Sequence, residues 1–340
     1  MFDKVFIIAE ASSNHNGNLE TALELVRSAK KSGADAIKFQ DYTLGSLFSP
    51  PHYERTMKIK NSKWQADIKR LEFRPDWHPA VSHEAQKHGI VYFSTPFSIE
   101  AVDRLDPFVP FYKISSGDIT FFPLLEKVGE KGKGVFISTG ASRIDEIDRA
   151  VSILQGFNLP FICVMHCIML YPAPSRLLNL NFIDRLKERY GMPVGFSDHS
   201  LGPEAAPIAV AKGVRAMEKH FTLDNRQEGA DHNSSADPGE FAELVRRVRS
   251  AESMLGPTER RLPAREKEER VYARRGIYTT VPIEQGEEIT YKNVTFLRPN
   301  ISIGAERIGD LLNKPVNRAV EPHVPLDPTV FDEKEIEKKP

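Results

Sequence analysis

The chain has 340 residues, more than one hydrophobic core usually serves, so we expect a large domain and a small one. Hydrophobic residues make up 40% and charged residues 27%, which is the composition of an ordinary globular protein. Lys and Arg (46) balance Asp and Glu (47), and the net charge of -1 argues against nucleic acid or another polyanion as partner. The N-terminal residues lack the features of a signal peptide and no later apolar run approaches a membrane span, so we expect a cytoplasmic protein without a membrane partner.

Short apolar runs alternate with amphipathic segments over the first 256 residues. The runs typical of buried strands cover residues 5–9, 34–39, 90–93, 111–114, 134–137, 161–165, 193–196 and 214–218. Helical periodicity follows in stretches such as 19–32, 144–154 and 240–255. This alternation predicts a parallel sheet, and eight units favour a closed (β/α)₈ TIM barrel over an open doubly wound sheet. No Gly-x-Gly-x-x-Gly turn follows the first run, which disfavours a dinucleotide-binding fold.

Polar side chains cluster where the predicted strands end, which is where a barrel of this type carries its active site. In chain order they include Glu10, Lys38, Gln40, Thr95, Lys113, Ser116, Ser138, Tyr171, Ser197 and His199. Two lysines opposite small hydroxyl residues can neutralise a compact phosphate and carboxylate. A single serine at a strand end is usually a cap, so the prediction depends on the recurrence of polar residues at nearly every strand.

Two histidines follow successive predicted strands, His199 in Gly-Phe-Ser-Asp-His-Ser and His220 in Glu-Lys-His-Phe-Thr. Either one alone is more often a hydrogen-bonded structural group. Two imidazoles at neighbouring strand ends can point into one cavity and share a metal ion, so together they predict a metal-dependent enzyme. The only cysteines, Cys163 and Cys167, lie too far apart along one predicted strand for a disulfide, and we expect both to be reduced structural thiols.

The character of the chain changes after residue 256. Residues 257–272 are charged and contain proline, which is typical of a linker, although 266–269 could be helical. From residue 273 short strand patterns alternate with turns, at 276–280, 283–289 and 294–299. We therefore expect a catalytic domain over 1–256, a linker over 257–272 and a small β-rich domain over 273–337.

Six motifs, in this order, resemble those of the sialic acid synthases. They are Ile7-Ile-Ala-Glu-Ala-Ser-Ser-Asn-His-Asn-Gly, Ala34-Asp-Ala-Ile-Lys-Phe-Gln, Phe93-Ser-Thr-Pro-Phe, Tyr112-Lys-Ile-Ser-Ser-Gly-Asp, Gly195-Phe-Ser-Asp-His and Glu218-Lys-His-Phe-Thr. The resemblance implies a TIM barrel followed by an antifreeze-like (SAF) domain. It also implies a transferase that condenses phosphoenolpyruvate with an open-chain N-acetylmannosamine-like sugar, giving a nine-carbon 2-keto-3-deoxy acid and phosphate.

The resemblance assigns roles to individual residues. It implies that His199 and His220 bind a divalent metal, usually manganese in this family, with magnesium and cobalt as alternatives. Glu10 matches the acidic residue beside the reacting centre, and Gln40 lies among the substrate-binding positions. The positions that hold phosphoenolpyruvate correspond to Lys38, Thr95, Lys113, Ser116, Ser138 and Ser197.

Three further residues match family positions in or near the active site. Tyr171 aligns with a tyrosine near the substrate, and Asp231 aligns with an acid that contacts sugar hydroxyls. Arg298 matches an arginine of the SAF domain that enters the active site of the partner subunit in this family. A domain-swapped homodimer is therefore implied.

One position, Met169, departs from the family pattern and leaves open whether the chain is catalytically active. Met169 stands two residues before Tyr171-Pro172, where family members generally carry a polar residue, and a thioether cannot replace the hydrogen bonds of an amide. This favours an alternative in which the chain is a catalytically inactive sugar-binding homologue. The sugar is also open, because the motifs resemble pseudaminic and legionaminic acid synthases, which use diacetamido-trideoxy hexoses. Residues 44–74, which vary in the family, are candidates for defining that sugar.

Overall fold

The structure, a computed structural model, describes residues 2–58 and 63–332. The chain divides into two compact units, Met1–Gly256 and Pro257–Pro340. Each unit has a hydrophobic core of its own. The described helices include none that is long and apolar enough to cross a membrane.

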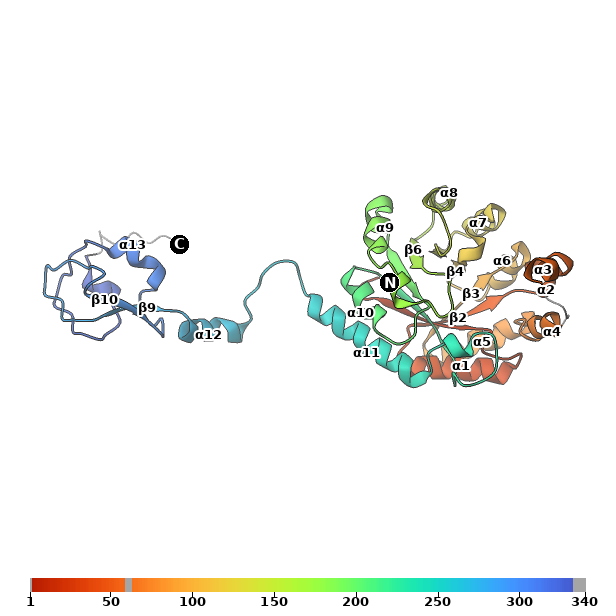
Figure 1. Cartoon of the computed structure of the whole chain (residues 1–340), viewed down its shortest axis with the longest axis horizontal. Coiled ribbons are helices and arrows are strands. Elements are labelled where there is room, and N and C mark those ends of the chain that lie inside the picture. The colour runs from red at the N-terminus through yellow and green to blue at the C-terminus, as the bar shows by residue number, and fades with distance from the viewer. Residues whose placement is uncertain (1, 59–62, 333–340) are drawn as a thin grey trace. The chain divides into compact units, whose positions relative to one another are not determined.

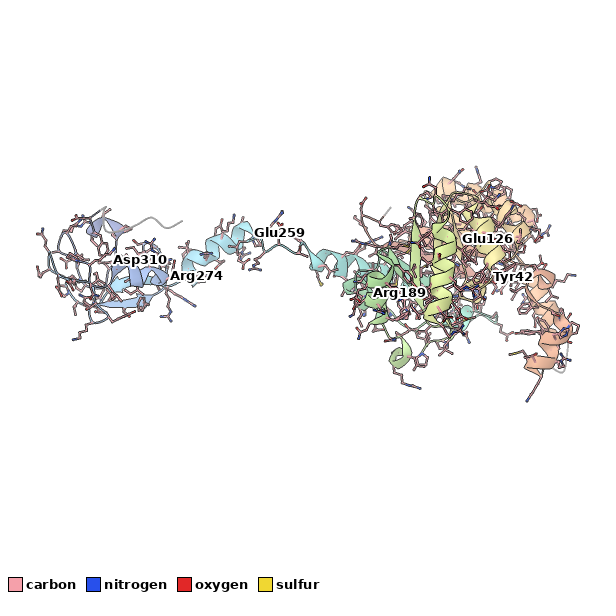
Figure 2. The ribbon with its side chains drawn as sticks, turned by 90° about the horizontal axis from the view of Figure 1, so that it is seen from above. Tyr42, Glu126, Arg189, Glu259, Arg274 and Asp310 are labelled. Carbon is pink, nitrogen blue, oxygen red and sulfur yellow. The ribbon has the colours of Figure 1, made fainter. Side chains whose placement is uncertain are left out.

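The first unit is a closed barrel of eight parallel strands in sequence order, as the alternation of strands and helices predicts (Figure 1). The strands are β1 (Phe6–Ser12), β2 (Ala36–Asp41), β3 (Val91–Pro96), β4 (Phe111–Ile114), β5 (Gly134–Ser138), β6 (Ile162–Cys167), β7 (Val194–Asp198) and β8 (Ala216–His220). The helices around them are α1 (Leu19–Lys31), α2 (Leu44–Leu47), α3 (Pro50–Met57), α4 (Lys63–Arg70), α5 (His78–His88), α6 (Ile99–Leu105), α7 (Phe122–Gly129), α8 (Ile144–Gln155), α9 (Phe182–Tyr190), α10 (Ala205–Ala211) and α11 (Pro238–Leu255). Helices α1 and α5–α11 form the outer layer, where the exposed Glu126 of α7 and Arg189 of α9 lie (Figure 2), whereas α2, α3 and α4 have no buried residue.

Helix α1 shows how the local sequence directs this layer. Asn18 caps its first turn by accepting a 3.1 Å hydrogen bond from the backbone N–H of Thr21. Its apolar residues recur on one face, and the buried ones pack into the core of the barrel unit. Lys30 and Lys31 lie in the last turn, where a positive charge complements the helix dipole. The sequence therefore fixes both the ends of the helix and the face that packs on the barrel.

The strands continue beyond the apolar runs that predict them. β1 ends at Ser12 rather than at residue 9, β2 at Asp41 rather than 39, and β8 at His220 rather than 218. The backbone ladder holds these polar ends, since Glu10 pairs with Lys38 on one side and with His220 on the other. His220 is thus the last residue of its strand, not a residue beyond it.

Phenylalanine side chains fill the interior of the barrel at the N-terminal ends of the strands. Phe6 stacks on Phe136 with 6.1 Å between ring centroids, and Phe111 meets Phe136 edge to face at 5.3 Å. Lys113 lies two residues after Phe111 on β4, and Ser138 lies two residues after Phe136 on β5, so both point to the same face as these phenylalanines. The alternation of side chains therefore puts a layer of polar residues directly above an apolar plug.

The second unit contains two paired strands, β9 (Gly276–Thr279) and β10 (Val294–Leu297), which run antiparallel. Its described α-helices are α12 (Ala264–Ala273) and α13 (Ile308–Leu311), and it also contains short 3-10 helices over Ala305–Arg307 and Pro328–Val330. Helix α12 thus covers the whole second half of the segment expected as a linker. The predicted strand at 283–289 forms only isolated bridges, such as Ile283 with Val320. Residues 333–337 of the expected C-terminal domain lie outside the described residues.

Candidate active site

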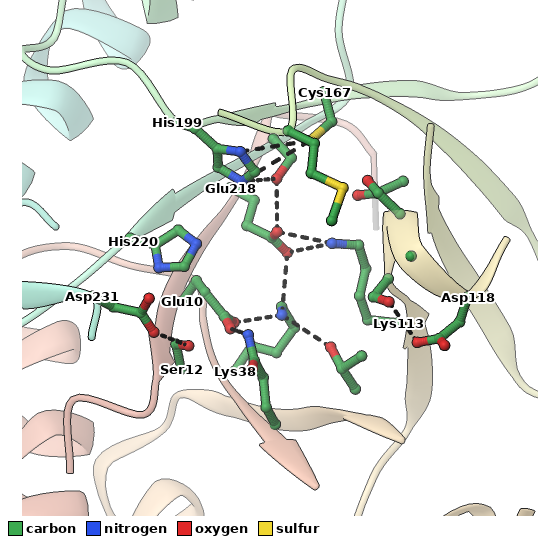
Figure 3. Close-up of a pocket in the computed structure, with 18 of the residues that line it drawn as sticks. Glu10, Ser12, Lys38, Lys113, Asp118, Cys167, His199, Glu218, His220 and Asp231 are labelled. Atoms are coloured by element: carbon green, nitrogen blue, oxygen red, sulfur yellow. Dashed lines mark hydrogen bonds and ion pairs between the residues drawn. The ribbon is translucent and has the colours of Figure 1, made fainter. Parts of the chain in front are cut away.

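A cavity of about 490 Å³ opens at the C-terminal ends of the barrel strands (Figure 3). The structure brings together there every residue of the barrel that the sequence singles out for the site. Those lining residues are Glu10, Lys38, Gln40, Thr95, Lys113, Ser116, Ser138, Tyr171, Ser197, His199, His220 and Asp231. Their assembly depends on the alternation of the strands, which turns every second side chain inward.

Two buried lysines and two buried glutamates form the floor of this cavity. Lys113 Nζ donates to Glu218 Oε1 at 2.8 Å and to Oε2 at 3.1 Å. Lys38 Nζ lies 2.5 Å from Glu10 Oε2 and 3.8 Å from Glu218 Oε2. Gln40 Nε2 donates to the other oxygen of Glu10 at 2.8 Å, which fixes that carboxylate. The two positive charges are therefore balanced by two negative charges within the same layer.

These contacts keep both kinds of group ionised. Burial raises the pKa of Glu218, but the charges of Lys113 and Lys38 outweigh burial and hold that pKa well below its ordinary value. Burial lowers the pKa of Lys38, but Glu10 and Glu218 outweigh it and leave the pKa above the ordinary value. Glu218 and Lys38 are thus charged although both are buried.

Hydroxyl groups beside this floor retain capacity for a ligand. Thr95 Oγ1 accepts a 3.0 Å hydrogen bond from Lys38, so its own proton is available for another acceptor. Ser116 Oγ similarly accepts a 3.0 Å bond from the backbone N–H of Gly140. Within residues 2–58 and 63–332, Ser138 Oγ is buried without a hydrogen-bond partner. Buried polar groups normally have partners, so these hydroxyls are suited to an oxygen-rich anion.

The two histidines meet on one side of the cavity, with 5.3 Å between their ring centroids. His199 Nδ1 makes a 2.8 Å hydrogen bond to the backbone carbonyl of Ile168, while Tyr171 stacks on the ring at 4.1 Å. Burial, together with the neighbouring His220, lowers the pKa of His199 to about 3. The imidazole is therefore neutral at ordinary pH, and the carbonyl of Ile168 fixes the proton on Nδ1. Nε2 is then unprotonated, and it lies 3.4 Å from Ser197 Oγ and 4.0 Å from Cys167 Sγ.

Asp231 lies on the same side of the cavity, beside the ring of His220 (Figure 3). Its Oδ2 accepts hydrogen bonds from the hydroxyls of Ser12 at 2.5 Å and Ser13 at 2.9 Å. Burial raises the pKa of Asp231, but His220 and the two hydroxyls outweigh burial and leave it below the ordinary value. A fixed carboxylate at the rim can accept hydrogen bonds from a polyhydroxylated ligand.

Several lining residues are absent from the predicted site, among them Glu218, Ser12, Asp118 and Cys167. Glu218 is two residues before His220 on β8, and this spacing alone would have placed it on the same inner face. Ser12 precedes the turn after β1, and Asp118 accepts a 2.6 Å hydrogen bond from Ser115 while burial raises its pKa. Cys167 is a free thiol, as expected, but it is not only structural, because it lines the cavity.

The residue that departs from the family pattern and the segment expected to define the sugar both reach the cavity. Met169 lines it, with 46% of its surface exposed. From the segment 44–74, Leu47 of α2 contributes an apolar side chain to the lining. Part of the wall is therefore apolar, at a place where the family pattern predicts a polar side chain.

Arg298 belongs to the second unit, directly after β10, and is exposed. The backbone around it is held within that unit. The hydroxyl of Tyr278 donates a 2.7 Å hydrogen bond to the carbonyl of Pro299, and the N–H of Asn300 donates to the carbonyl of Val271 at 2.8 Å. The guanidinium is thus presented from a fixed segment.

Comparisons with known proteins agree with this arrangement. Residues 25–260 match the model of the NeuB family. A pseudaminic acid synthase of Campylobacter jejuni is 36% identical over 324 residues, covering 94% of each protein, and an uncharacterized protein of Methanocaldococcus jannaschii is 42% identical over 94% of this chain and 92% of its own length. The crystal structure of N-acetylneuraminic acid synthetase from Leptospira borgpetersenii, in complex with citrate, superimposes with a TM-score of 0.71 and 36% identity over 79% of this chain and 90% of its own.

Proposed function

The chain belongs to the NeuB family, the sialic acid synthases, and from this premise we propose that it condenses phosphoenolpyruvate with an open-chain 2-acetamido sugar. The product is a nonulosonic acid, with release of phosphate. The observation that carries the proposal is the convergence of Lys38, Lys113 and the two imidazoles on one cavity that also contains Glu10. This convergence of cationic, acidic and imidazole groups supports an active synthase over an inactive sugar-binding homologue.

Phosphoenolpyruvate suits the charged floor of the cavity. It carries a phosphate and a carboxylate, and Lys38 and Lys113 would neutralise part of this charge through charge-assisted hydrogen bonds. The hydroxyls of Thr95, Ser116 and Ser138 would donate to the remaining oxygens. Ser197 already donates to Glu218 at 2.9 Å, so its oxygen would accept rather than donate in the same arrangement.

The reaction forms one carbon–carbon bond and breaks one carbon–oxygen bond. C3 of phosphoenolpyruvate attacks the aldehyde carbon of the sugar, and the resulting alkoxide takes up a proton. Water then adds to the cationic C2 and loses a proton, after which the bond between C2 and the phosphate oxygen breaks to leave the 2-keto group. Glu10 would accept the proton of that water, and the contacts of its carboxylate with Gln40 and Lys38, which fix it in the cavity, support this role.

The site fits a divalent metal held by His199 and His220. Among the described residues, His220 Nδ1 is buried without a hydrogen-bond partner, and a neutral His199 has an unprotonated Nε2, beside which Ser197 directs its own proton to Glu218. No group of three or more His, Cys, Asp or Glu in that part of the chain could hold a metal, so substrate or water would complete the ligand set. When bound, Mn²⁺, or Mg²⁺ or Co²⁺ in its place, would stabilise negative charge developing on the aldehyde oxygen.

The acceptor sugar has two candidates. N-acetylmannosamine, or a close relative, is the first, with its hydroxyls meeting Asp231 and its chain lying near Tyr171. A diacetamido-trideoxy hexose is the second, which two observations favour. Met169 and Leu47 line the cavity with apolar groups that suit a deoxygenated carbon, and the pseudaminic acid synthase of Campylobacter jejuni is similar over nearly its full length.

We further propose that the second unit is an SAF domain and that the active form is a domain-swapped homodimer. Arg298 would then enter the cavity of the partner subunit and meet the acetamido group of the sugar. The surroundings of Arg298 support this proposal, because Leu297 is 48% and Ile301 60% exposed beside it. An arginine flanked by exposed apolar side chains is typical of a surface that another protein covers.

The experiment is a product assay on the full chain. The protein is mixed with phosphoenolpyruvate, Mn²⁺ and either N-acetylmannosamine or a 2,4-diacetamido-2,4,6-trideoxy hexose, and phosphate release is measured together with the mass of the acid formed. Sugar-dependent phosphate release with a product of the summed mass is the expected result. No release with any 2-acetamido hexose, by a folded protein with Mn²⁺ present, would contradict the proposal.

A further inference from the structure

The residues that directly precede the two cavity histidines form an ion pair of their own. Lys219 Nζ lies 2.8 Å from Asp198 Oδ2, and both side chains are buried. β7 and β8 place the two residues side by side in the parallel register. Because neighbours along a strand point to opposite faces, this pair lies on the outer face of the barrel wall, whereas Ser197, Glu218 and His220 point inward.

The same two side chains also hold the turn that carries His199. Lys219 Nζ donates to the backbone carbonyls of Ser200 and, at 3.1 Å, Gly202. Asp198 Oδ1 accepts from the backbone N–H of Ser200 at 2.9 Å and from its hydroxyl at 2.6 Å. The ammonium group thus has three acceptors, and the turn is bonded on both sides of residue 199. A side chain of β8, next to one imidazole, thereby fixes the backbone next to the other.

Packing of the barrel wall alone does not require charges at this position. Phe196 and Met217 lie two residues before Asp198 and Lys219, pair with each other in the same register and also face outward. Both are fully buried. Burying an ion pair has a desolvation cost that an apolar pair avoids, and such pairs are best understood through the geometry that they specify. The charged pair occurs at the one register position that adjoins both histidines.

We propose that Asp198 and Lys219 are positioning residues that set the separation and orientation of His199 and His220, and through them the affinity of the cavity for a divalent cation. The inference rests on the proposed function, in which the two imidazoles bind the metal. Residues that orient metal ligands typically change metal affinity 10- to 100-fold when they are replaced. The pair would act without touching the metal or the substrate.

The test measures Mn²⁺ binding to the full chain directly, by titration with detection of free Mn²⁺ by electron paramagnetic resonance. The variants are Asp198→Asn, Lys219→Met and the double variant, which leaves no unpaired buried charge, together with Lys219→Arg as the conservative replacement. Lys212→Met is the matched control, because its Nζ makes a 2.6 Å ion pair with Asp184 on the outer helices. Thermal melting of the metal-free proteins reports separately on stability.

The Mn²⁺ dissociation constant should rise about tenfold or more in Asp198→Asn and in the double variant, whereas Lys219→Arg and Lys212→Met should stay within about threefold of the unmodified chain. The double variant keeps the test decisive if a single variant does not fold. Variants that fold and bind Mn²⁺ as the unmodified chain does, even with lowered melting temperatures, would overturn this inference alone. An unmodified chain that binds no Mn²⁺ would overturn the metal proposal and this inference with it.

Discussion

Lys113 and Glu218 make a two-pronged ion pair in the floor of the cavity, with N–O distances of 2.8 and 3.1 Å. The pair connects β4 with β8, strands that are not neighbours in the barrel. The carboxylate of Glu218 therefore orients the ammonium group of Lys113 before an anion binds to it. The orientation reduces the entropy lost on binding, while the carboxylate offsets part of the attraction.

The first prediction concerns this lysine. Lys113→Ala should raise the KM for phosphoenolpyruvate by about 10- to 100-fold and the KM for the sugar much less, because a charge-assisted hydrogen bond contributes about 1.5–3 kcal/mol. Steady-state kinetics with each substrate varied in turn provide the measurement. Lys187→Ala, which removes a partly exposed lysine of α9, is the control and should behave as the unmodified enzyme. Equal changes in both KM values would refute the assignment.

The second prediction concerns Asp231, on the opposite side of the cavity, and its effect on the KM for the sugar. Asp231→Ala should raise the KM for the sugar by about tenfold or more and affect phosphoenolpyruvate little, because it removes an acceptor that Ser12 and Ser13 hold in place. A larger effect on phosphoenolpyruvate would show that Asp231 acts on the charged floor instead. The same kinetic series decides between the two outcomes.

The third prediction concerns the metal. His199→Ala and His220→Ala should each weaken Mn²⁺ binding and lower turnover by about 100-fold or more, because charge stabilisation by a metal contributes several kcal/mol. Exposed His52, which contacts Ser49, provides the control His52→Ala. Treatment with a chelator should abolish activity of the unmodified chain and Mn²⁺ should restore it. Full activity of both cavity variants in chelator would exclude the proposed role.

The barrel was predictable because its strands and helices carry strong periodic patterns, and those patterns place the polar strand ends at one edge. The ends of the strands were less predictable. An apolar run stops where side chains begin to face the cavity, yet the backbone ladder continues, as Glu10 in β1 and His220 in β8 show. Polarity in these positions reflects the site and not the end of the strand.

Glu218 illustrates the difference between placing a residue and recognising its role, because its spacing from His220 predicts its face but not its partner. It closes an apolar run and precedes a lysine and a histidine, so its charge resembles that of an ordinary strand end. The role of Glu218 in the cavity depends on Lys113, which lies 105 residues earlier in the chain and donates a hydrogen bond to its carboxylate inside the barrel. The strands of the second unit were difficult to predict for another reason. Much of this unit is held by isolated bridges and a small core rather than by regular strands, so it has few periodic patterns.

The fourth prediction concerns the stability of the metal-free protein in acid. The pKa of His199 falls from 6.5 to about 3 on folding, so between these values the unfolded chain binds a proton that the folded chain does not. The free energy of unfolding must therefore fall as the pH is lowered through this window, by about 2 kcal/mol between pH 6.5 and 5 from this group. Urea denaturation in chelator at both pH values should show a smaller loss for His199→Gln. An identical loss in the two proteins would contradict the prediction.

The fifth prediction tests the exchange of the second unit between subunits. If Arg298 enters the partner's cavity, Arg298→Ala and His199→Ala chains should each be nearly inactive as homodimers, the first because the acetamido group loses its cationic partner. A mixed dimer contains one cavity with both residues intact, His199 from one chain and Arg298 from the other. Random exchange of equal amounts should therefore restore about a quarter of the activity of the unmodified enzyme, since half of the dimers are mixed and each has one intact site of two.

The matched control for this experiment mixes His199→Ala with His220→Ala. Both residues belong to the same barrel unit, so no combination of chains assembles an intact site, and activity should stay at the level of the separate variants. Native mass spectrometry on differently labelled chains establishes that mixed dimers form in both experiments. Recovery with Arg298→Ala but not with His220→Ala would demonstrate that the site is shared between subunits, because only residues on separable units can complement one another. Absence of recovery in proven mixed dimers would place the action of Arg298 within its own chain.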